Sequence, residues 1–402
     1  MASTPTAQPA VPPDDRPRAT TDPNGLTVNQ NPGSTLPLSP DWAMTDATGL
    51  VQTGRLADAT ALIQRTLTGG VHTAPAVQAP TASGAPHAPS VPARLQPFPH
   101  QLPALGEHLA HLPHIRGLPT LGATTTTPTL PGTVRTGIHH CPAGSRPYRL
   151  YVPSASFEGP RPLVVMLHGG TQDAAAFADA TRMEAIAEEQ GFLVVHPEQV
   201  TSANPMRYWN WFSDQARTTG EPAIIAGLIH ELLRTEDADP ARVYVAGFSA
   251  GAAMAAVLAS THPDIIAAVG IHSGLPAGAA HDVASAMAAM RSPGPVRALP
   301  QPVPAITFHG DADPTVNIAN SRSLGDQFGA GASREIETCN PARGRAYTVS
   351  RQRQGDTVAL EQWVVHGLGH AWSGGRTGGS YTDPTGPDAS REMVRFFLTH
   401  HN

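Results

Sequence analysis

The chain of 402 residues carries 26 basic and 32 acidic residues, a formal net charge of −6, and only 14% of its residues are charged. It has no Lys/Arg-dense run, so we expect no nucleic-acid partner. The two cysteines, Cys141 and Cys339, are too far apart in sequence to form a zinc-binding pattern. One disulfide and two reduced thiols are both compatible with them.

Proline separates an N-terminal region from the rest of the chain. The first 134 residues hold 21 of the 41 prolines, twice the density of the remaining 268 residues. Because proline fixes φ and removes a backbone donor, we expect residues 1–40 to be disordered and residues 71–134 to form a linker. Between them, residues 41–70 carry apolar side chains at roughly helical spacing and predict a short helical hairpin.

The expected linker contains three histidines, His108, His111 and His114, at a spacing that would place them near one face of a helix. Pro113 lies inside this set and no acidic or thiol ligand adjoins it, so we expect solvated histidines and no metal site. The N-terminus lacks the basic and apolar segments of a secretory signal peptide.

Residues 135–402 alternate short apolar runs with helical segments and predict one catalytic domain. The expected strands are Arg149–Val152, Leu163–Leu167, Phe192–Val195, Val243–Ala246, Ile265–Ile271, Ala305–Phe308 and Leu360–Val365. The expected helices are Ala174–Gln190, Pro222–Leu233, Ala250–Ser260 and Ser390–His400. Such alternation predicts an α/β fold with a doubly wound, mostly parallel sheet. The uncharged stretch 243–262 fits a buried strand and helix better than a membrane span.

One expected strand runs into Gly247-Phe248-Ser249-Ala250-Gly251 and then directly into an alanine-rich helix. Ligands of parallel sheets bind beyond the carboxyl ends of the strands. A tight strand-to-helix turn leaves no room for side chains beside the serine, which accounts for the two glycines. The pentapeptide alone is a weak signal, but in this position it predicts that Ser249 is a nucleophile.

A serine nucleophile needs a base, and the base needs a carboxylate to orient it. Asp311 and Asp313 follow one later strand, and His366 and His370 follow the last strand. We select Asp313, the fifth residue of the run that begins His-Gly, and His370, whose glycine-flanked loop lets the imidazole reach Ser249. Asp311 is expected to cap the turn and His366 to be structural. The order serine, aspartate, histidine is that of α/β-hydrolases.

The segment Leu167-His168-Gly169-Gly170 supplies the remaining element of such a site. We expect the backbone N–H groups of Gly170 and Ala250 to form an oxyanion hole. His168 is expected to support the turn rather than to take part in catalysis.

In these motifs the sequence resembles the polyhydroxybutyrate (PHB) depolymerase family of esterases, which also includes feruloyl and acetylxylan esterases. The matching stretches cover most of residues 145–400 and are RPYRLYVP, LVVMLHGGTQDAAAFA, YWNWF, RVYVAGFSAGAAMAAVLA, FHGDADPTV and GLGHAWSGG. The resemblance implies an α/β-hydrolase with Ser249, Asp313 and His370 as its triad. Family members often carry two cysteines that can pair at the places held here by Gly170 and Tyr208.

The resemblance also bears on location and on the form of the substrate. It implies export for many relatives, whereas the N-terminus shows no ordinary signal, so an extracellular and a cytoplasmic location both stay open. Polymer-degrading relatives often carry an appended binding module, and here the sequence ends directly after its last expected helix.

Three of the five tryptophans, Trp209, Trp211 and Trp372, belong to the candidate loops. We expect them to rim an apolar cleft for an acyl chain or polyester segment, the alternative being that Trp209 and Trp211 support the loop from the core. The predicted reaction is hydrolysis of a polyester or hydroxyacyl ester through an acyl-enzyme, with a carbohydrate ester as the alternative substrate. No metal or organic cofactor is expected, and the oligomeric state stays open.

Overall fold

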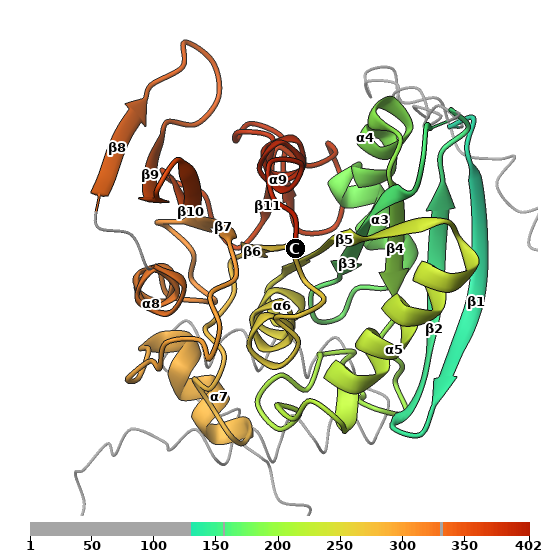
Figure 1. The fold of residues 1–402 in the computed structure, drawn as a ribbon. Coiled ribbons are helices and arrows are strands. Elements are labelled where there is room, and N and C mark those ends of the chain that lie inside the picture. Colours follow the sequence, from blue (N-terminus) through green and yellow to red (C-terminus); the bar gives the residue numbers. More distant parts are fainter. Residues whose placement is uncertain (1–129, 156, 330–332) are drawn as a thin grey trace, which may run out of the picture.

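The computed structural model describes residues 130–155, 157–329 and 333–402. In this part of the chain ten strands form one sheet, in the order β1-β2-β4-β3-β5-β6-β7-β10-β9-β8 (Figure 1). Six strands at its centre are parallel: β4 (Leu193–Pro197), β3 (Arg161–Leu167), β5 (Ala238–Phe248), β6 (Ala268–His272), β7 (Ala305–Gly310) and β10 (Thr357–Val365). Antiparallel pairs complete both edges: β1 (Thr133–Cys141) with β2 (Gly144–Val152), and β9 (Tyr347–Gln354) with β8 (Ser333–Cys339).

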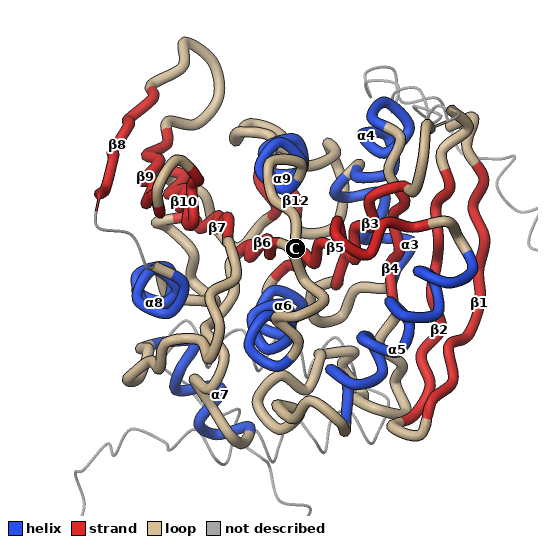
Figure 2. Tube along the Cα trace, viewed as in Figure 1, coloured by secondary structure: helices blue, strands red, loops and turns tan. Residues whose placement is uncertain are grey.

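Helices cover both faces of the sheet (Figures 1 and 2). One face carries α3 (Ala174–Thr181), α4 (Met183–Gln190) and α9 (Ala389–Phe397). The other carries α5 (Gly220–Thr235), α6 (Ala250–Thr261), α7 (Val283–Arg291) and α8 (Ala319–Phe328). Two short strands, β11 (Trp372–Ser373) and β12 (Thr382–Asp383), pair separately. The doubly wound, mostly parallel α/β-hydrolase fold predicted from the sequence is therefore confirmed.

The central strands are apolar on both sides because each side meets a helical layer. In β3, Leu163 and Val165 pack toward α5 and α6, whereas Val164 and Met166 pack toward α3, α4 and α9. The first ten residues of α6 are all buried, so all but the last two residues of the helix that follows the candidate nucleophile lie inside the molecule. Such burial holds the turn before α6 firmly in place.

All seven expected strands are present, but the outer strands β1, β8 and β9, like the short β11 and β12, were not predicted from the sequence. These outer strands carry charged and polar residues on exposed faces, so they lack the apolar runs of central strands. The helices α7 and α8 were missed as well; α8 buries Asn320, Ser321 and Gln327 in place of an apolar stripe. The helix expected over 174–190 is two helices, because Arg182 between them adopts a left-handed φ of 55°.

The domain predictions are tested only in part by the described residues. The segment 1–40, predicted to be disordered, and the helical hairpin predicted over 41–70 lie outside them, as does most of the predicted linker 71–134. Strand β1 begins at Thr133, two residues before the expected start of the catalytic domain.

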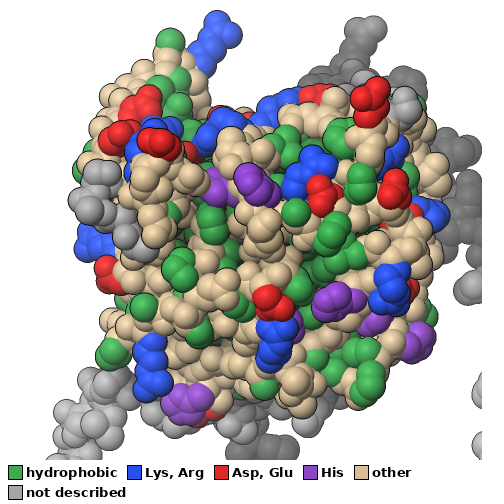
Figure 3. All heavy atoms as spheres, viewed as in Figure 1, with side chains coloured by type: hydrophobic (Ala, Val, Ile, Leu, Met, Phe, Trp, Pro, Cys, Tyr) green, Lys and Arg blue, Asp and Glu red, His purple; other side chains and the backbone are tan. Residues whose placement is uncertain are grey.

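Cys141 and Cys339 lie on opposite edges of the sheet, in β1 and β8, and both are free thiols. Because nine strand spacings of about 4.8 Å separate these edges, the two residues cannot form a disulfide within one chain. None of the helices in the described ranges combines the length and the apolar composition that crossing a bilayer would need. On the face seen in Figure 3, acidic and basic side chains are interspersed and neither gathers into a broad patch.

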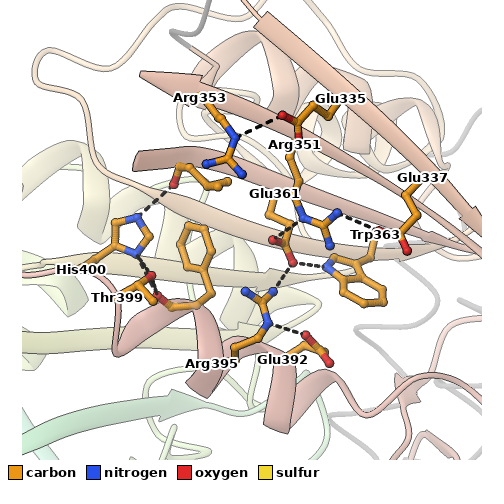
Figure 4. A network of polar contacts seen from close by, with 12 residues as sticks. Glu335, Glu337, Arg351, Arg353, Glu361, Trp363, Glu392, Arg395, Thr399 and His400 are labelled. Carbon is orange, nitrogen blue, oxygen red and sulfur yellow. Dashed lines mark hydrogen bonds and ion pairs between the residues drawn. The ribbon is translucent and has the colours of Figure 1, made fainter. Parts of the chain in front are cut away.

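A polar network fastens the outer strands β8 and β9 to the core (Figure 4). At its centre Glu361 of β10 is 1% exposed and accepts hydrogen bonds from Arg351 Nε (3.0 Å), Trp363 Nε1 (2.7 Å) and Arg395 of α9. Arg351 also binds Glu337 of β8, at 2.9 Å, at the exposed rim. Two guanidinium groups and an indole thus satisfy a buried carboxylate and tie three strands to a helix.

Replacement of Glu361 by glutamine should lower the free energy of unfolding by about 3 kcal/mol, because the buried position loses the negative charge to which the partly exposed Arg351 and Arg395 donate. Glu337→Gln is the matched control: it removes an exposed partner of the same arginine and should cost less than about 1 kcal/mol. Urea unfolding followed by tryptophan fluorescence measures both. Equal effects of the two substitutions would contradict a central role for Glu361.

Candidate active site

Ser249 lies in the turn between β5 and α6, with φ 53° and ψ −118°. This backbone conformation is strained for a residue with a side chain. A Cβ on Gly247 would lie 2.4 Å from the carbonyl carbon of Gly251, and one on Gly251 would lie 2.1 Å from the oxygen of Leu167. Both glycines of the motif are thus required by close backbone packing. The Ser249 amide donates to the carbonyl of His272 (2.9 Å), which ties the turn to β6.

Asp313 and His370 form a hydrogen-bonded pair beyond the ends of β7 and β10. Nδ1 of His370 lies 2.7 Å from Oδ2 of Asp313, whose side chain is completely buried. Its other oxygen accepts the backbone N–H groups of Thr315 (2.8 Å) and Val316 (2.9 Å). Burial alone would raise the pKa of Asp313, but its bond with His370 and its other polar partners outweigh burial and lower that pKa. Asp313 is therefore ionised at neutral pH and can hold one tautomer of His370.

Ser249 lies near the Asp313–His370 pair, but no hydrogen bond joins Ser249 to His370. Phe248, the residue before Ser249, packs against the His370 imidazole with ring centroids 4.8 Å apart. Catalytic hydrogen bonds are often long in structures without ligand, so this geometry is compatible with a serine–histidine dyad.

The alternative aspartate and histidine form a second pair nearby. Asp311 Oδ2 lies 2.8 Å from Nδ1 of His366, and its other oxygen accepts the N–H of Gly367 (2.6 Å). Nε2 of His366 is already engaged with Thr348, at 3.0 Å. Both nitrogens of His366 are therefore occupied in bracing the loop, so neither is free to act on Ser249.

The candidate oxyanion-hole residues lie on adjacent segments. The segment that ends in Gly170 runs against the first turn of α6, where a Cβ on Gly251 would touch the carbonyls of both Leu167 and His168. Within the described residues, the N–H groups of Gly170 and Ala250 donate to no protein acceptor. Free amides at a helix N-terminus are suited to a developing negative charge.

His168 braces the same segment from below. Nε2 accepts the Gln199 amide (3.0 Å), and Nδ1 donates to the Gly169 carbonyl (2.7 Å). Burial lowers the pKa of His168 to about 4, so the ring is neutral at neutral pH. Both of its nitrogens are occupied in supporting the turn.

Gly170 and Tyr208 lie in direct contact. A Cβ on Gly170 would lie 2.1 Å from Cε1 of Tyr208, so the tyrosine ring fills the space that a side chain would need. Burial, with a smaller contribution from Tyr381, raises the pKa of Tyr208 to about 12. The ring thus packs one loop on the other where many relatives are expected to carry two cysteines.

The prediction that three tryptophans rim the cleft is wrong for this structure. Trp209 is 0% exposed, Trp211 4% and Trp372 1%, so none presents a face to a substrate. Trp209 donates to the His168 carbonyl (3.1 Å), and Trp372 donates to Ser390 Oγ (3.1 Å). Their indoles are buried in the core and support the loops from inside the molecule.

His272, at the carboxyl end of β6, is a site residue that the sequence analysis missed. Its carbonyl accepts the Ser249 amide, and its Nε2 accepts the Ser373 amide (3.0 Å) from the loop that carries His370. The ring stacks on Trp372, with centroids 4.9 Å apart. Burial, with the nearby His309 and His370, lowers its pKa well below 6.5, which keeps Nε2 an acceptor. Its place directly after a central strand was the available signal.

Within the described ranges, no group of three or more histidine, cysteine, aspartate or glutamate side chains could hold a metal ion. The three linker histidines lie outside those ranges.

The fold and this arrangement define the class of α/β-hydrolases. A family model described as "Esterase PHB depolymerase" matches residues 146–339. This match covers just under half of the 402 residues, and over this segment the chain is similar to the esterases of that family.

The relatives include two kinds of esterase. Poly(3-hydroxyalkanoate) depolymerase C of Paucimonas lemoignei is 34% identical over 229 residues, which cover 52% of this chain and 54% of that protein. A probable acetylxylan esterase A of Aspergillus fumigatus is 34% identical over 140 residues, 34% of this chain and 36% of that protein. The matches thus span about half or less of the relatives' length. The solved acetyl xylan esterase from Aspergillus awamori is 20% identical, with a TM-score of 0.49, covering 66% of this chain and 99% of that one.

His272→Asn should lower kcat by roughly ten- to a hundredfold with little change in KM, because it removes the acceptor for Ser373 and misplaces the His370 loop. In His272→Gln the amide oxygen can take the place of Nε2 and should restore most of the activity. Steady-state kinetics with p-nitrophenyl butyrate measures both. Equal kcat values for the two variants would contradict a positioning role for the imidazole.

Buried neutral histidines should make the fold acid-sensitive. Burial lowers the pKa of His168 and His196 to about 4, against 6.5 for an unperturbed histidine. The unfolded chain therefore binds more protons than the folded one below about pH 6.5, and stability is lost as pH falls toward 4. At pH 5 each histidine should cost roughly 2 kcal/mol.

Urea unfolding at pH 7.5, 6 and 5 measures this loss. His196→Leu removes one of these buried imidazoles and should therefore flatten the pH dependence of stability. The substitution breaks no hydrogen bond, because neither nitrogen of His196 has a partner. His281→Ala, which removes a side chain that is 85% exposed, should leave it unchanged. If the free energy of unfolding fell equally with pH in the parent, His196→Leu and His281→Ala, the buried histidines would not be the cause of the acid sensitivity.

Proposed function

We propose that this esterase hydrolyses PHB-type polyester or short-chain hydroxyacyl esters, with Ser249 as nucleophile, His370 as base and Asp313 as its orienting acid. The observation that carries the proposal is the 2.7 Å bond between His370 and a buried Asp313, beside a serine held in a strained turn. Strained backbone is retained at functional sites when the surrounding packing fixes it.

The proposed reaction has two steps. His370 takes the hydroxyl proton of Ser249 as the Ser249 oxygen attacks the ester carbonyl. The backbone amides of Gly170 and Ala250 donate hydrogen bonds to the resulting oxyanion. His370 then gives the proton to the leaving alcohol. Water, activated by the same histidine, attacks the acyl-enzyme and releases the acid.

The substrate assignment rests on relatives of two kinds. The Paucimonas lemoignei relative is named as a poly(3-hydroxyalkanoate) depolymerase and shares the longer aligned segment. The acetylxylan esterase relatives favour a carbohydrate ester as the second candidate. The same triad serves both, and the surroundings of the leaving alcohol would differ.

Ser249→Ala should reduce kcat for p-nitrophenyl butyrate by about 10⁴-fold or more, as expected when a nucleophile is removed. Ser285→Ala, which removes a hydroxyl that caps α7, is the matched control and should keep full activity. A Ser249→Ala protein as active as its parent would disprove the mechanism.

A substrate panel decides between the two candidates. We expect faster hydrolysis of amorphous PHB and p-nitrophenyl butyrate than of methyl ferulate and acetylated xylan. Release of 3-hydroxybutyrate, ferulate and acetate is measured by chromatography at equal enzyme concentration. The reverse order of rates would assign the protein to carbohydrate esters.

A further inference from the structure

Tyr381 is an exposed aromatic residue at the approach to the candidate triad. It immediately precedes β12 and is 37% exposed, one of the few large hydrophobic residues of the described chain that reach the surface. Its φ of 53° is left-handed, which is unusual for a residue with a bulky side chain. Strain of this kind points to a position that the surroundings impose.

The phenol ring lies between the histidine and the oxyanion segment. Its centroid is 6.5 Å from that of His370, at 77°, and 6.2 Å from that of Phe248. Its hydroxyl lies 3.5 Å from Oγ1 of Thr171, the residue after Gly170. The side chain therefore spans from the proposed base to the proposed oxyanion hole.

Backbone hydrogen bonds fix this placement. The carbonyl of Tyr381 accepts the amide of Trp372 (2.7 Å), two residues beyond His370. The carbonyl of Ser380 accepts Nε2 of Gln172 (3.1 Å), from the segment that carries Gly170. The ring is therefore presented by a loop that is anchored to both catalytic segments, and little ordering is needed when a substrate binds.

The direction of proton transfer tells which part of the ester meets this ring. His370 must give its proton to the leaving alcohol, so the alcohol part lies beside His370 in the transition state. We propose that Tyr381 determines specificity for the alcohol part of the ester and favours bulky alcohols, such as the next monomer of a polyester. This inference rests on the proposed serine esterase function.

Two variants separate the ring from the hydroxyl. Tyr381→Gly removes the ring and suits the left-handed backbone, so the loop should keep its fold. Tyr381→Phe keeps the ring and removes the hydroxyl. Ile336→Ala, which trims an exposed apolar side chain on β8 at the far edge of the sheet, is the control.

The experiment compares an alcohol series with an acyl series. Ethyl and cyclohexyl butyrate share their acyl group, whereas p-nitrophenyl acetate, butyrate and hexanoate share their alcohol. In Tyr381→Gly the ratio of kcat/KM for cyclohexyl over ethyl butyrate should fall by about tenfold, as expected from the loss of apolar contact area. The acyl preference should change by less than about twofold, and Tyr381→Phe and Ile336→Ala should match the parent.

An unchanged alcohol ratio, or a change confined to the acyl series, would overturn this proposal. Turnover of ethyl butyrate, whose alcohol is small, by the parent and by Tyr381→Gly reports intact sites, so misfolding is distinguished from lost specificity. Failure of the proposed function would look different: the parent would hydrolyse none of these esters, or Ser249→Ala would hydrolyse them equally well.

Discussion

The close packing of three backbone segments around Ser249 is the constraint on which the site depends. The end of β3 touches Gly251 and the start of α6 touches Gly247, so neither glycine can be replaced by a larger residue without moving the backbone. The strained Ser249 backbone costs about 1–3 kcal/mol and persists because α6 is buried throughout its first ten residues. A rigid interior helix thus fixes both a hydroxyl and the free amide of Ala250 in one small volume.

Around this turn, neutral imidazoles replace the charged groups that often orient catalytic loops. His168 accepts from one loop and His272 from another, each through Nε2 and each buried. A protonated ring could not accept these bonds, so the low pKa of each histidine belongs to its positioning role. The sheet therefore carries, beyond the carboxyl ends of β10, β3 and β6, one histidine bonded to Asp313 and two that hold the neighbouring loops.

The central sheet could be predicted from the sequence because strands covered by helices on both faces must be apolar throughout. The outer strands could not, since β8 and β9 carry charged and polar residues, such as Arg351 and Glu337, in place of an apolar run. The triad candidates could be predicted because each follows a strand in a recognisable order. Tyr381 and His272 gave no motif: their places depend on how separate loops meet.

The tryptophans also show that the exposure of a side chain could not be predicted from its place in the sequence. The three tryptophans do lie in the candidate loops, as predicted. Whether their side chains are buried depends on how the neighbouring helices pack, and the local sequence does not determine this packing. The aromatic side chain that instead lies exposed near the site is Tyr381, whose hydroxyl tolerates water while the ring packs.

The two cysteines at opposite edges of the sheet have a consequence for the whole molecule. No covalent cross-link within the chain holds this fold, so its stability does not depend on the redox potential around it. Of the two locations that the sequence leaves open, neither would alter the bonding inside the domain. The protein can accordingly be made under reducing conditions, with no oxidative refolding step and with two well-separated thiols available for labelling.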